Sequence, residues 1–396
     1  MSDTVGTVVR GIRAPIIRQG DDLAQIVVDS LLAASKEEGF DFKDRDVVAV
    51  TEAVVARAQG NYATIDQIAE SVRKHFPTGE FGVVFPILSR NRFSVCLRGI
   101  ARGAKKITLM LSYPSDEVGN HLVDLDKLDE AGINPWTDEL TAEQFRNYFG
   151  SVRHTFTGVD YVEYYTSIIE GEGAEANVIF ANNAKTILNY TKNVLCSDIH
   201  TRARTKRLLK AAGAERVYGL DDILSEPESG SGFNAEYGLL GSNKATDDTV
   251  KLFPRNCDEF VSAVYAGLHE KTGKNIEVMV YGDGAFKDPV GKIWELADPV
   301  VSPAHTPGLI GTPNELKLKY LADNDFAGLS GEALKDAIKK SIREKASDLK
   351  GTMATQGTTP RRLTDLLGSL SDLTSGSGDK GTPIVLIQNY FTNYAD

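Results

Sequence analysis

The stretch Asp46-Val-Val-Ala-Val-Thr-Glu52, continued by Ala53-Val-Val-Ala-Arg-Ala-Gln-Gly60, decides the fold of the first part of the chain. Its β-branched run predicts a buried strand over 46–52, and the next segment predicts a helix over 53–58 that stops at Gly60. A strand that delivers Thr51 and Glu52 to the start of a helix can present polar groups to a ligand. The same pattern is equally typical of a capped helix that binds nothing.

Composition indicates the class of protein. The chain has 396 residues, 41% of them hydrophobic and 25% charged, so we expect two or three globular domains. Its net charge of −11 argues against nucleic acid or an anionic membrane surface as a partner. No signal-peptide pattern or long apolar run is visible, and the three cysteines form no CxxC pair. We therefore expect a cytoplasmic protein without disulfides or a zinc knuckle.

Between residues 83 and 224, strand patterns alternate with helical patterns. This alternation predicts a parallel sheet covered by helices, whose ligand-binding edge lies at the carboxyl ends of the strands. No Gly-x-Gly-x-x-Gly follows these strands, which argues against a dinucleotide site and an oxidoreductase, and a purely structural role stays open. The expected strands are 83–88, 107–111, 177–181, 194–196 and 216–218, and the expected helices are 184–191 and 201–212.

The remaining elements follow from apolar periodicity and from helix start and stop signals. Asp21 or Asp22 is a suitable N-cap for the first helix. Four prolines within 299–313 predict irregular surface structure there. We expect helices over 23–32, 258–272, 332–350 and 360–373, and strands over 276–281 and 384–388.

Two acidic spots carry the strongest chemical signal. Asp247 and Asp248 follow a short apolar stretch, and Asp283 ends the expected strand 276–281 between two glycines. Carboxylates at strand ends suit a hard divalent cation that holds phosphate oxygens. If Asp247 and Asp283 converge to about 4 Å, they repel by about 4 kcal/mol at an effective dielectric near 20, so a cation would be needed between them. Hairpin turns and helix caps are the alternative, since both use the same residues.

Candidate anion-binding groups come from three further segments. Lys380, in Ser375-Gly-Ser-Gly-Asp-Lys-Gly-Thr382, can reach a phosphate held by backbone amides, or the segment can be a flexible connector. It does not match GxxxxGK[ST]. Arg202, Lys206 and Lys210 share a helical face that can bind an anion or simply be solvated. A last group can position an anionic substrate or line a sheet edge: Arg90, Arg92, Arg98 and Arg102.

Several of these pieces together resemble the coenzyme F-420 γ-glutamyl ligases. The opening Gly11-Ile-Arg-Ala-Pro-Ile-Ile-Arg-Gln-Gly-Asp-Asp-Leu-Ala24, followed by 46–60, is similar to the family opening that contains "GDDLA". Asn243-Lys-Ala-Thr-Asp247 resembles the family metal motif "NAGID", and Gly282-Asp283-Gly284 resembles "TDT" without its threonines. The closing segments 363–367 and 376–388 are similar to the family's last helix, Gly-rich turn and strand.

The resemblance implies an α/β protein: an α+β ligase core of residues 1–82, 235–300 and 350–396, interrupted by an inserted Rossmann-like α/β domain of residues 83–234. Residues 301–349 would form an irregular Pro-rich loop and a charged helix. The family joins glutamate to a carboxylate substrate with GTP and Mg²⁺ or Mn²⁺. By resemblance we expect a homodimer with small-molecule carboxylate and amino-acid substrates, with GTP or ATP as co-substrate.

The resemblance also implies roles for particular residues. Asp247 and Asp283 would bind the metal, with Asp248 in reserve, and Asp283 would also act in catalysis. Arg57 stands where the family lysine touches phosphate, so it would contact the nucleotide and stabilise the transferred group. Thr51, Glu52 and Lys380 would face the nucleotide. The lost threonine beside Asp283 and the altered phosphate turn favour a second hypothesis, a nucleotide- or metabolite-binding protein that has lost catalysis on the same scaffold.

Overall fold

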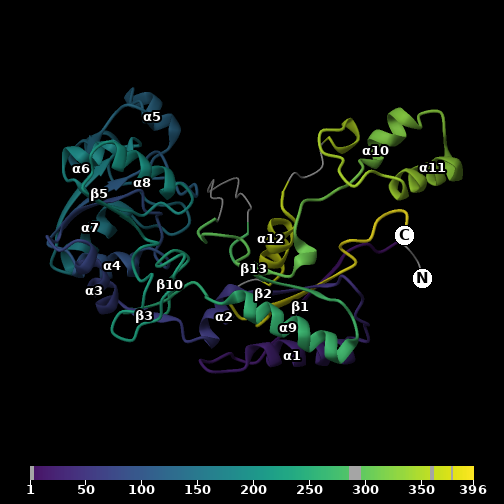
Figure 1. Cartoon of the computed structure of the whole chain (residues 1–396). Helices are drawn as coiled ribbons and strands as arrows, with labels where there is room; N and C mark the ends of the chain where they lie inside the picture. Colours follow the sequence, from purple (N-terminus) through teal and green to yellow (C-terminus); the bar gives the residue numbers. More distant parts are fainter. Residues whose placement is uncertain (1–3, 285–295, 357–360, 376–377) are drawn as a thin grey trace.

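The computed structural model describes residues 4–284, 296–356, 361–375 and 378–396. It shows a mixed α/β chain with two lobes, each built on its own sheet (Figure 1). Three segments discussed above lie partly outside the described residues. They are the part of the expected ligase core over 285–295, the start of the helix expected over 360–373, and residues 376–377 of the 375–382 segment.

A five-stranded sheet forms the first lobe, in the strand order β1-β14-β2-β12-β13. At its centre β2 and β12 run parallel, with Thr51 opposite Tyr281. β14, from the far end of the chain, pairs antiparallel with both β1 and β2. The strands are β1 (Val8–Ile12), β2 (Val47–Thr51), β12 (Glu277–Tyr281), β13 (Ala304–His305) and β14 (Ile384–Gln388).

Helices cover both faces of this sheet. Val48 and Val50 of β2 join the apolar layer under α1 (Leu23–Glu38) and α9 (Cys257–Thr272). Val47 and Ala49 join the opposite layer, under α12 (Leu363–Ser375). Because both faces are buried, β2 is a continuous apolar run rather than an alternating one. α1 begins as expected, since the Asp22 side chain accepts the backbone N–H of Gln25 at 3.0 Å.

The second lobe contains a six-stranded sheet in the order β6-β7-β5-β4-β8-β9, and all its pairs except β6–β7 are parallel. The parallel sheet expected within 83–224 is therefore present. Its first strand ends at Val84, earlier than expected, because Phe85 adopts a left-handed backbone with φ 57°. The strands are β4 (Glu80–Val84), β5 (Lys106–Leu111), β6 (Leu140–Thr141), β7 (Glu175–Phe180), β8 (Asn193–Cys196) and β9 (Arg216–Gly219).

Helices also cover the six-stranded sheet, and two apolar clusters lie on its two faces. One cluster includes side chains from α3 (Ile65–His75), α4 (Ser94–Arg102) and α7 (Tyr161–Gly171). The other includes side chains from the 3-10 turn Ala184–Asn189 and from α8 (Arg202–Ala211). The peripheral helices of this lobe are α5 (Leu125–Ala131) and α6 (Ala142–Phe149).

The chain crosses between the lobes at a small sheet in the order β10-β11-β3. β3 (Tyr62–Thr64) follows α2 (Glu52–Ala58), and β10 (Asn243–Lys244) and β11 (Thr249–Lys251) precede α9. The apolar core of the second lobe includes residues from Ala63 to Leu252, so it extends beyond 83–234 on both sides. The domain limits of 83 and 234 expected for an inserted domain stay a prediction.

A peripheral unit follows β13 in the chain. It contains α10 (Leu318–Tyr320) and α11 (Gly331–Arg343), which pack with Ala395 at the C-terminus. α11 is shorter than the helix expected over 332–350. Throughout the described part of the chain, every helix is too short or too polar to cross a membrane.

Candidate functional site

The carboxyl ends of β2 and β12 bring two acidic residues to one edge of the five-stranded sheet. Because the strands are parallel and Thr51 lies opposite Tyr281, Glu52 and Asp283 follow at neighbouring positions. Glu52 is buried at the start of α2, and the Asp283 side chain is 25% exposed. In parallel sheets, ligands bind beyond the carboxyl ends of the strands, which is the edge where Glu52 and Asp283 lie.

Two further carboxylates join Glu52 and Asp283. Asp298, whose side chain is 1% exposed, accepts the backbone N–H of Asp283 at 2.8 Å. Asp372, on α12, accepts the backbone N–H of Gly284 at 2.9 Å. We call Glu52, Asp283, Asp298 and Asp372 the carboxylate cluster.

Two cations face the carboxylate cluster, and both come from outside the five-stranded sheet. Arg92, just before α4 in the second lobe, donates from Nη1 to Asp298 at 2.6 Å and from Nη2 to Asp283 at 2.7 Å. Lys251, on β11, donates to both oxygens of Glu52 at 2.9 and 2.8 Å. The second lobe, through Arg92, and the small sheet between the lobes, through Lys251, therefore supply the cations that pair with the carboxylate cluster.

The carboxylate cluster contains four acidic groups, and only two cations pair with them. Burial is the main reason that the pKa of Glu52 is raised, and Asp298 adds to it despite Lys251. Burial, followed by Asp298, raises the pKa of Asp283 to about 8, and Arg92 offsets this only in part. Burial also raises the pKa of Asp372. Only if all four acids ionised would two negative charges be left unpaired, and the raised pKa values of Glu52, Asp283 and Asp372 mean that the folded chain resists that state.

Asp247 and Asp248 are not part of the carboxylate cluster, so the expected meeting of Asp247 with Asp283 around one cation is not what the structure shows. Both lie at the exposed tip of the hairpin formed by β10 and β11. Asp247, 87% exposed, pairs with Lys244 at 2.7 Å, and Asp248 pairs with Arg98 at 2.8 Å. The hairpin alternative holds here, because the two strands need a polar turn between them.

Comparison with known proteins agrees with the sequence motifs. The model of the F420-0:gamma-glutamyl ligase family matches residues 11–389, nearly the whole chain. The chain belongs to the F420-0:gamma-glutamyl ligase family. The resemblance expected from residues 11–24 and 46–60 is thereby confirmed, and membership of this family indicates a ligase with small-molecule substrates. No curated protein matches the chain significantly.

One departure from the motif of the F420-0:gamma-glutamyl ligase family has a structural reason. If the resemblance to "TDT" holds, Gly282 takes the place of its first threonine; a Cβ at this position would clash with the carboxylate of Asp298. A glycine here lets Asp298 approach the backbone and accept the N–H of Asp283. A glycine at position 282 is therefore required by the close approach of Asp298.

The other residues expected to bind nucleotide occupy two places. The backbone N–H of Thr51 donates to the carbonyl of Pro383, so the loop that carries Lys380 lies at the same sheet edge as Thr51 and Glu52. Lys380 lines a groove of about 770 Å³ together with Arg10 and Arg13. Arg57 lies instead in the last turn of α2, exposed, and donates from Nε to the carbonyl of Ile17 at 2.5 Å.

Sequence reasoning missed three members of the site and left one open. Asp298 precedes a proline-rich stretch, Asp372 lies within an amphipathic helix, and Lys251 lies in a short strand, so none has a strand-end or motif signal. The sequence predicts that Arg92 either positions an anionic substrate or lines a sheet edge; in the structure it contacts the carboxylate cluster. The sequence around Asp298, which directly precedes Pro299, does not predict that this carboxylate is buried.

The carboxylate cluster suits a divalent metal by its chemistry but not in its present arrangement. Carboxylate oxygens are the ligands that Mg²⁺ and Mn²⁺ prefer. Within the described ranges, no three His, Cys, Asp or Glu side chains are placed to hold a metal ion together. Arg92 instead binds Asp283 and Asp298. A metal ion that binds these two residues must therefore replace the guanidinium.

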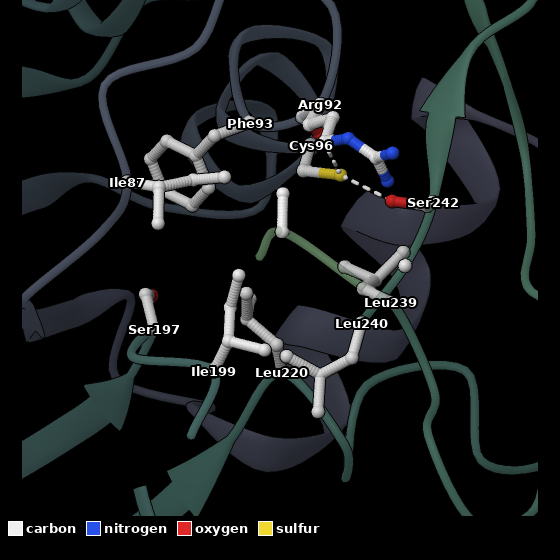
Figure 2. Close-up of a pocket in the computed structure, with 12 residues that line it drawn as sticks. Ile87, Arg92, Phe93, Cys96, Ser197, Ile199, Leu220, Leu239, Leu240 and Ser242 are labelled. Carbon is white, nitrogen blue, oxygen red and sulfur yellow. Dashed lines mark hydrogen bonds between the residues drawn. The ribbon is translucent and has the colours of Figure 1, made fainter. Parts of the chain in front are cut away.

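A small cavity lies beside Arg92, at the carboxyl ends of β4 and β8 (Figure 2). Its walls are mostly apolar, from Ile87, Phe93 and Leu240 among others, and Cys96 contacts Ser242 across one side at 3.1 Å. The Ser197 Oγ is buried there without a hydrogen-bond partner among the described residues. At about 20 Å³ the cavity is no larger than one water molecule.

Proposed function

We propose that the chain is a nucleotide- and divalent-metal-dependent amide ligase of the gamma-glutamyl type. In this chemistry the γ-phosphoryl group of GTP or ATP passes to the carboxylate of a small substrate and forms an acyl phosphate. The amino group of an amino acid then attacks the acyl carbon, phosphate leaves, and an amide bond remains. By family resemblance we also propose a cytoplasmic homodimer.

The observation that carries this proposal is the carboxylate cluster, in which four acidic groups meet only two cations. Asp283, Asp298 and Asp372 would hold Mg²⁺ or Mn²⁺, which neutralises phosphate charge when bound. Both oxygens of Glu52 accept hydrogen bonds from Lys251, so we assign Glu52 a structural role at the end of β2 rather than the role of a metal ligand. The family membership of the chain adds the reaction class.

One cation for the nucleotide, Lys380, lies in the loop at the same sheet edge. Lys380, Arg10 and Arg13 line one groove, and guanidinium groups bind phosphate oxygens by paired hydrogen bonds. The groove adjoins the loop that contacts the backbone of Thr51. We therefore propose that the phosphates extend from this groove toward the carboxylate cluster. A phosphate contact of Arg57 stays a proposal drawn from the family motif.

One observation favours a second candidate, a binding protein on the ligase scaffold without catalysis. Arg92 already pairs with both Asp283 and Asp298, and by the motif resemblance the threonine expected beside Asp283 is missing. A chain with a permanently filled metal site would bind a metabolite or nucleotide without transferring phosphate.

Phosphate release distinguishes the two candidates. The full chain is incubated with Mn²⁺ or Mg²⁺, GTP or ATP, L-glutamate as one amine, hydroxylamine as a trapping amine, and a panel of small carboxylic acids. A ligase releases phosphate and forms a hydroxamate only when nucleotide, metal and acid are all present. Asp283→Asn abolishes both products, whereas the matched change Asp247→Asn leaves them unchanged. Nucleotide binding without either product across the panel supports the binding protein.

A further inference from the structure

We propose that the second lobe contains a binding site for the α-ammonium and α-carboxylate groups of a free amino acid, at the N-terminus of α8, and that the side chain of Glu117 occupies the carboxylate position in this structure. The site shares no residue with the carboxylate cluster. It needs neither the metal nor the nucleotide of the proposed ligase, and it gives the second lobe a binding function of its own.

The topology of the six-stranded sheet favours a ligand at this place. β5 and β7 lie on one side of β4, and β8 and β9 lie on the other, so the direction in which strands are added reverses between β4 and β8. In open parallel sheets, ligands bind at such a switch point, beyond the carboxyl ends of the strands. Residues 197–201, which join β8 to α8, form the carboxyl end of β8.

A carboxylate of the protein itself already binds at this end of β8. Glu117, in the loop after β5, accepts the backbone N–H groups of Ile199, of His200 at 3.1 Å and of Thr201 at 3.3 Å. The Thr201 hydroxyl also donates to it, at 3.1 Å. We call these three N–H groups and this hydroxyl the α8 nest. Successive backbone N–H groups before a helix bind anions, and a free carboxylate can make the same hydrogen bonds as Glu117.

A second carboxylate faces the α8 nest and has a free oxygen. Asp198 is 0% exposed, and its Oδ2 accepts the hydroxyls of Thr201 at 2.8 Å and Thr205 at 2.6 Å. Its Oδ1 has no hydrogen-bond partner among the described residues. Burial raises the pKa of Asp198, and the nearby Glu117 adds to this despite the two hydroxyls. A buried carboxylate with a free oxygen beside an anion site suits an ammonium group, which would supply both the hydrogen bond and the positive charge.

The spacing of these two carboxylates matches an α-amino acid. Both Glu117 Oε2 and Asp198 Oδ2 lie on the Thr201 hydroxyl, at 3.1 and 2.8 Å, so they are at most about 6 Å apart. In an α-amino acid the nitrogen lies about 2.7 Å from the nearer carboxylate oxygen, and an N–H···O contact adds about 2.9 Å. An amino acid whose carboxylate replaces that of Glu117 can therefore place its ammonium on Asp198.

Glu117 can leave the α8 nest by turning outward into solvent. Its side chain is half-buried, and two of the three residues that donate to it are exposed. All hydrogen bonds to its carboxylate come from 199–201, so among the described residues no cation holds it. The neighbouring Asp116 is buried and accepts the backbone N–H of Leu88 at 2.8 Å, which anchors the main chain of the loop while the Glu117 side chain turns.

The test is isothermal titration calorimetry of the full chain with each of the common L-amino acids, in EDTA and without nucleotide. The amino acid that binds best is compared with its deaminated acid and with its amide, each of which lacks one of the two charged groups. We expect both analogues to bind about tenfold more weakly.

Three variants locate the binding. If Glu117 fills the α8 nest about nine-tenths of the time, Glu117→Ala tightens binding of the amino acid about tenfold. Asp198→Asn should weaken it about tenfold and bind the deaminated acid at least as well as the natural chain does. The control Glu143→Ala, at an exposed glutamate in the first turn of α6 in the same lobe, should match the natural chain.

The outcomes separate this inference from the proposed function. If folded Glu117→Ala binds no amino acid at millimolar concentration, or binds no more tightly than the natural chain, Glu117 is a fixed structural contact and the inference is wrong. Equal binding of the amino acid and its deaminated acid to the natural chain also overturns it, because Asp198 then holds no ammonium. If Glu117→Ala fails to fold, Glu117→Gln decides, since an uncharged side chain binds the nest less tightly and should still allow tighter binding. The titration contains neither metal nor nucleotide, so a negative result leaves the phosphate-release test of the ligase unaffected.

Discussion

Replacing Asp283 by asparagine should stabilise the metal-free protein while it removes metal binding. Asp283 has the most unfavourable charge environment in the cluster: it shares Arg92 with Asp298, and it follows β12, whose neighbour β2 ends one residue before Glu52. Asparagine has nearly the same shape and can still accept the hydrogen bond from Arg92. The substitution therefore removes one negative charge and little else.

The magnitude follows from the charges. At roughly 5 Å and an effective dielectric near 20, two carboxylates repel by about 3 kcal/mol. Loss of the charged partner of Arg92 offsets about 1 kcal/mol of this, because the remaining hydrogen bond is neutral on one side. A net gain of about 2 kcal/mol in the free energy of unfolding corresponds to a rise in Tm of about 2–3 °C for the chain of 396 residues.

The gain should depend on pH. Burial raises the pKa of Asp283 from 3.8 to about 8, so the folded chain holds a proton that the unfolded chain has released. The stability due to this proton is complete below pH 3.8 and is lost as the pH rises through 8. Asparagine cannot ionise, so the Tm of Asp283→Asn should exceed that of the natural chain most above pH 8 and only slightly near pH 5.

Differential scanning calorimetry in EDTA measures this difference at both pH values. Asp247→Asn is the matched control, because Asp247 is exposed at the hairpin tip and its Tm should equal that of the natural chain throughout. A lower Tm for Asp283→Asn at both pH values would refute the reasoning. It would mean that Asp283 is a stabilising partner of Arg92 rather than a strained member of the carboxylate cluster.

Three further predictions concern the same edge. Asp298→Ala should cost about 1–3 kcal/mol of unfolding free energy in calorimetry, because it leaves the buried N–H of Asp283 without an acceptor; an unchanged Tm would contradict this. Lys251→Met should cost about 3–5 kcal/mol by leaving Glu52 buried and unpaired, and adding Glu52→Leu should recover most of that loss; no recovery would rule out the ion pair as the cause. The Mn²⁺ affinity of the natural chain should rise with pH up to about 8 and then level off, because the metal must displace a proton from Asp283; an affinity constant from pH 6 to 9 in a calorimetric titration would oppose this.

Much of the fold follows from the sequence because its strands are buried on both faces. The β-branched runs 47–51 and 277–281 are long enough and apolar enough to exclude a surface position, and they form the central parallel pair. The alternation within 83–224 likewise predicts the parallel sheet. Local backbone geometry was less predictable: Phe85 adopts a left-handed conformation that no apolar pattern announces, and it ends β4 early.

The candidate site was only partly predictable, because its members meet through tertiary packing. Asp283 and Glu52 could be found, since each follows a recognisable strand. Asp298 and Asp372 come from a proline-flanked segment and a helix, where a carboxylate is ordinarily solvated. Asp247 gave the same local signal as Asp283, yet it lies in a hairpin turn. A strand-end aspartate is thus informative only when the next strand in the sheet is known.

The most direct test of the account is anomalous diffraction from crystals of the full chain soaked with Mn²⁺ and GTP. The account predicts a manganese peak within coordination distance of Asp283 and of Asp298 or Asp372, with the phosphates of the nucleotide on the same side. A peak only at the exposed Asp247 and Asp248, or none at a saturating concentration of Mn²⁺, would contradict a metal-dependent ligase at this edge.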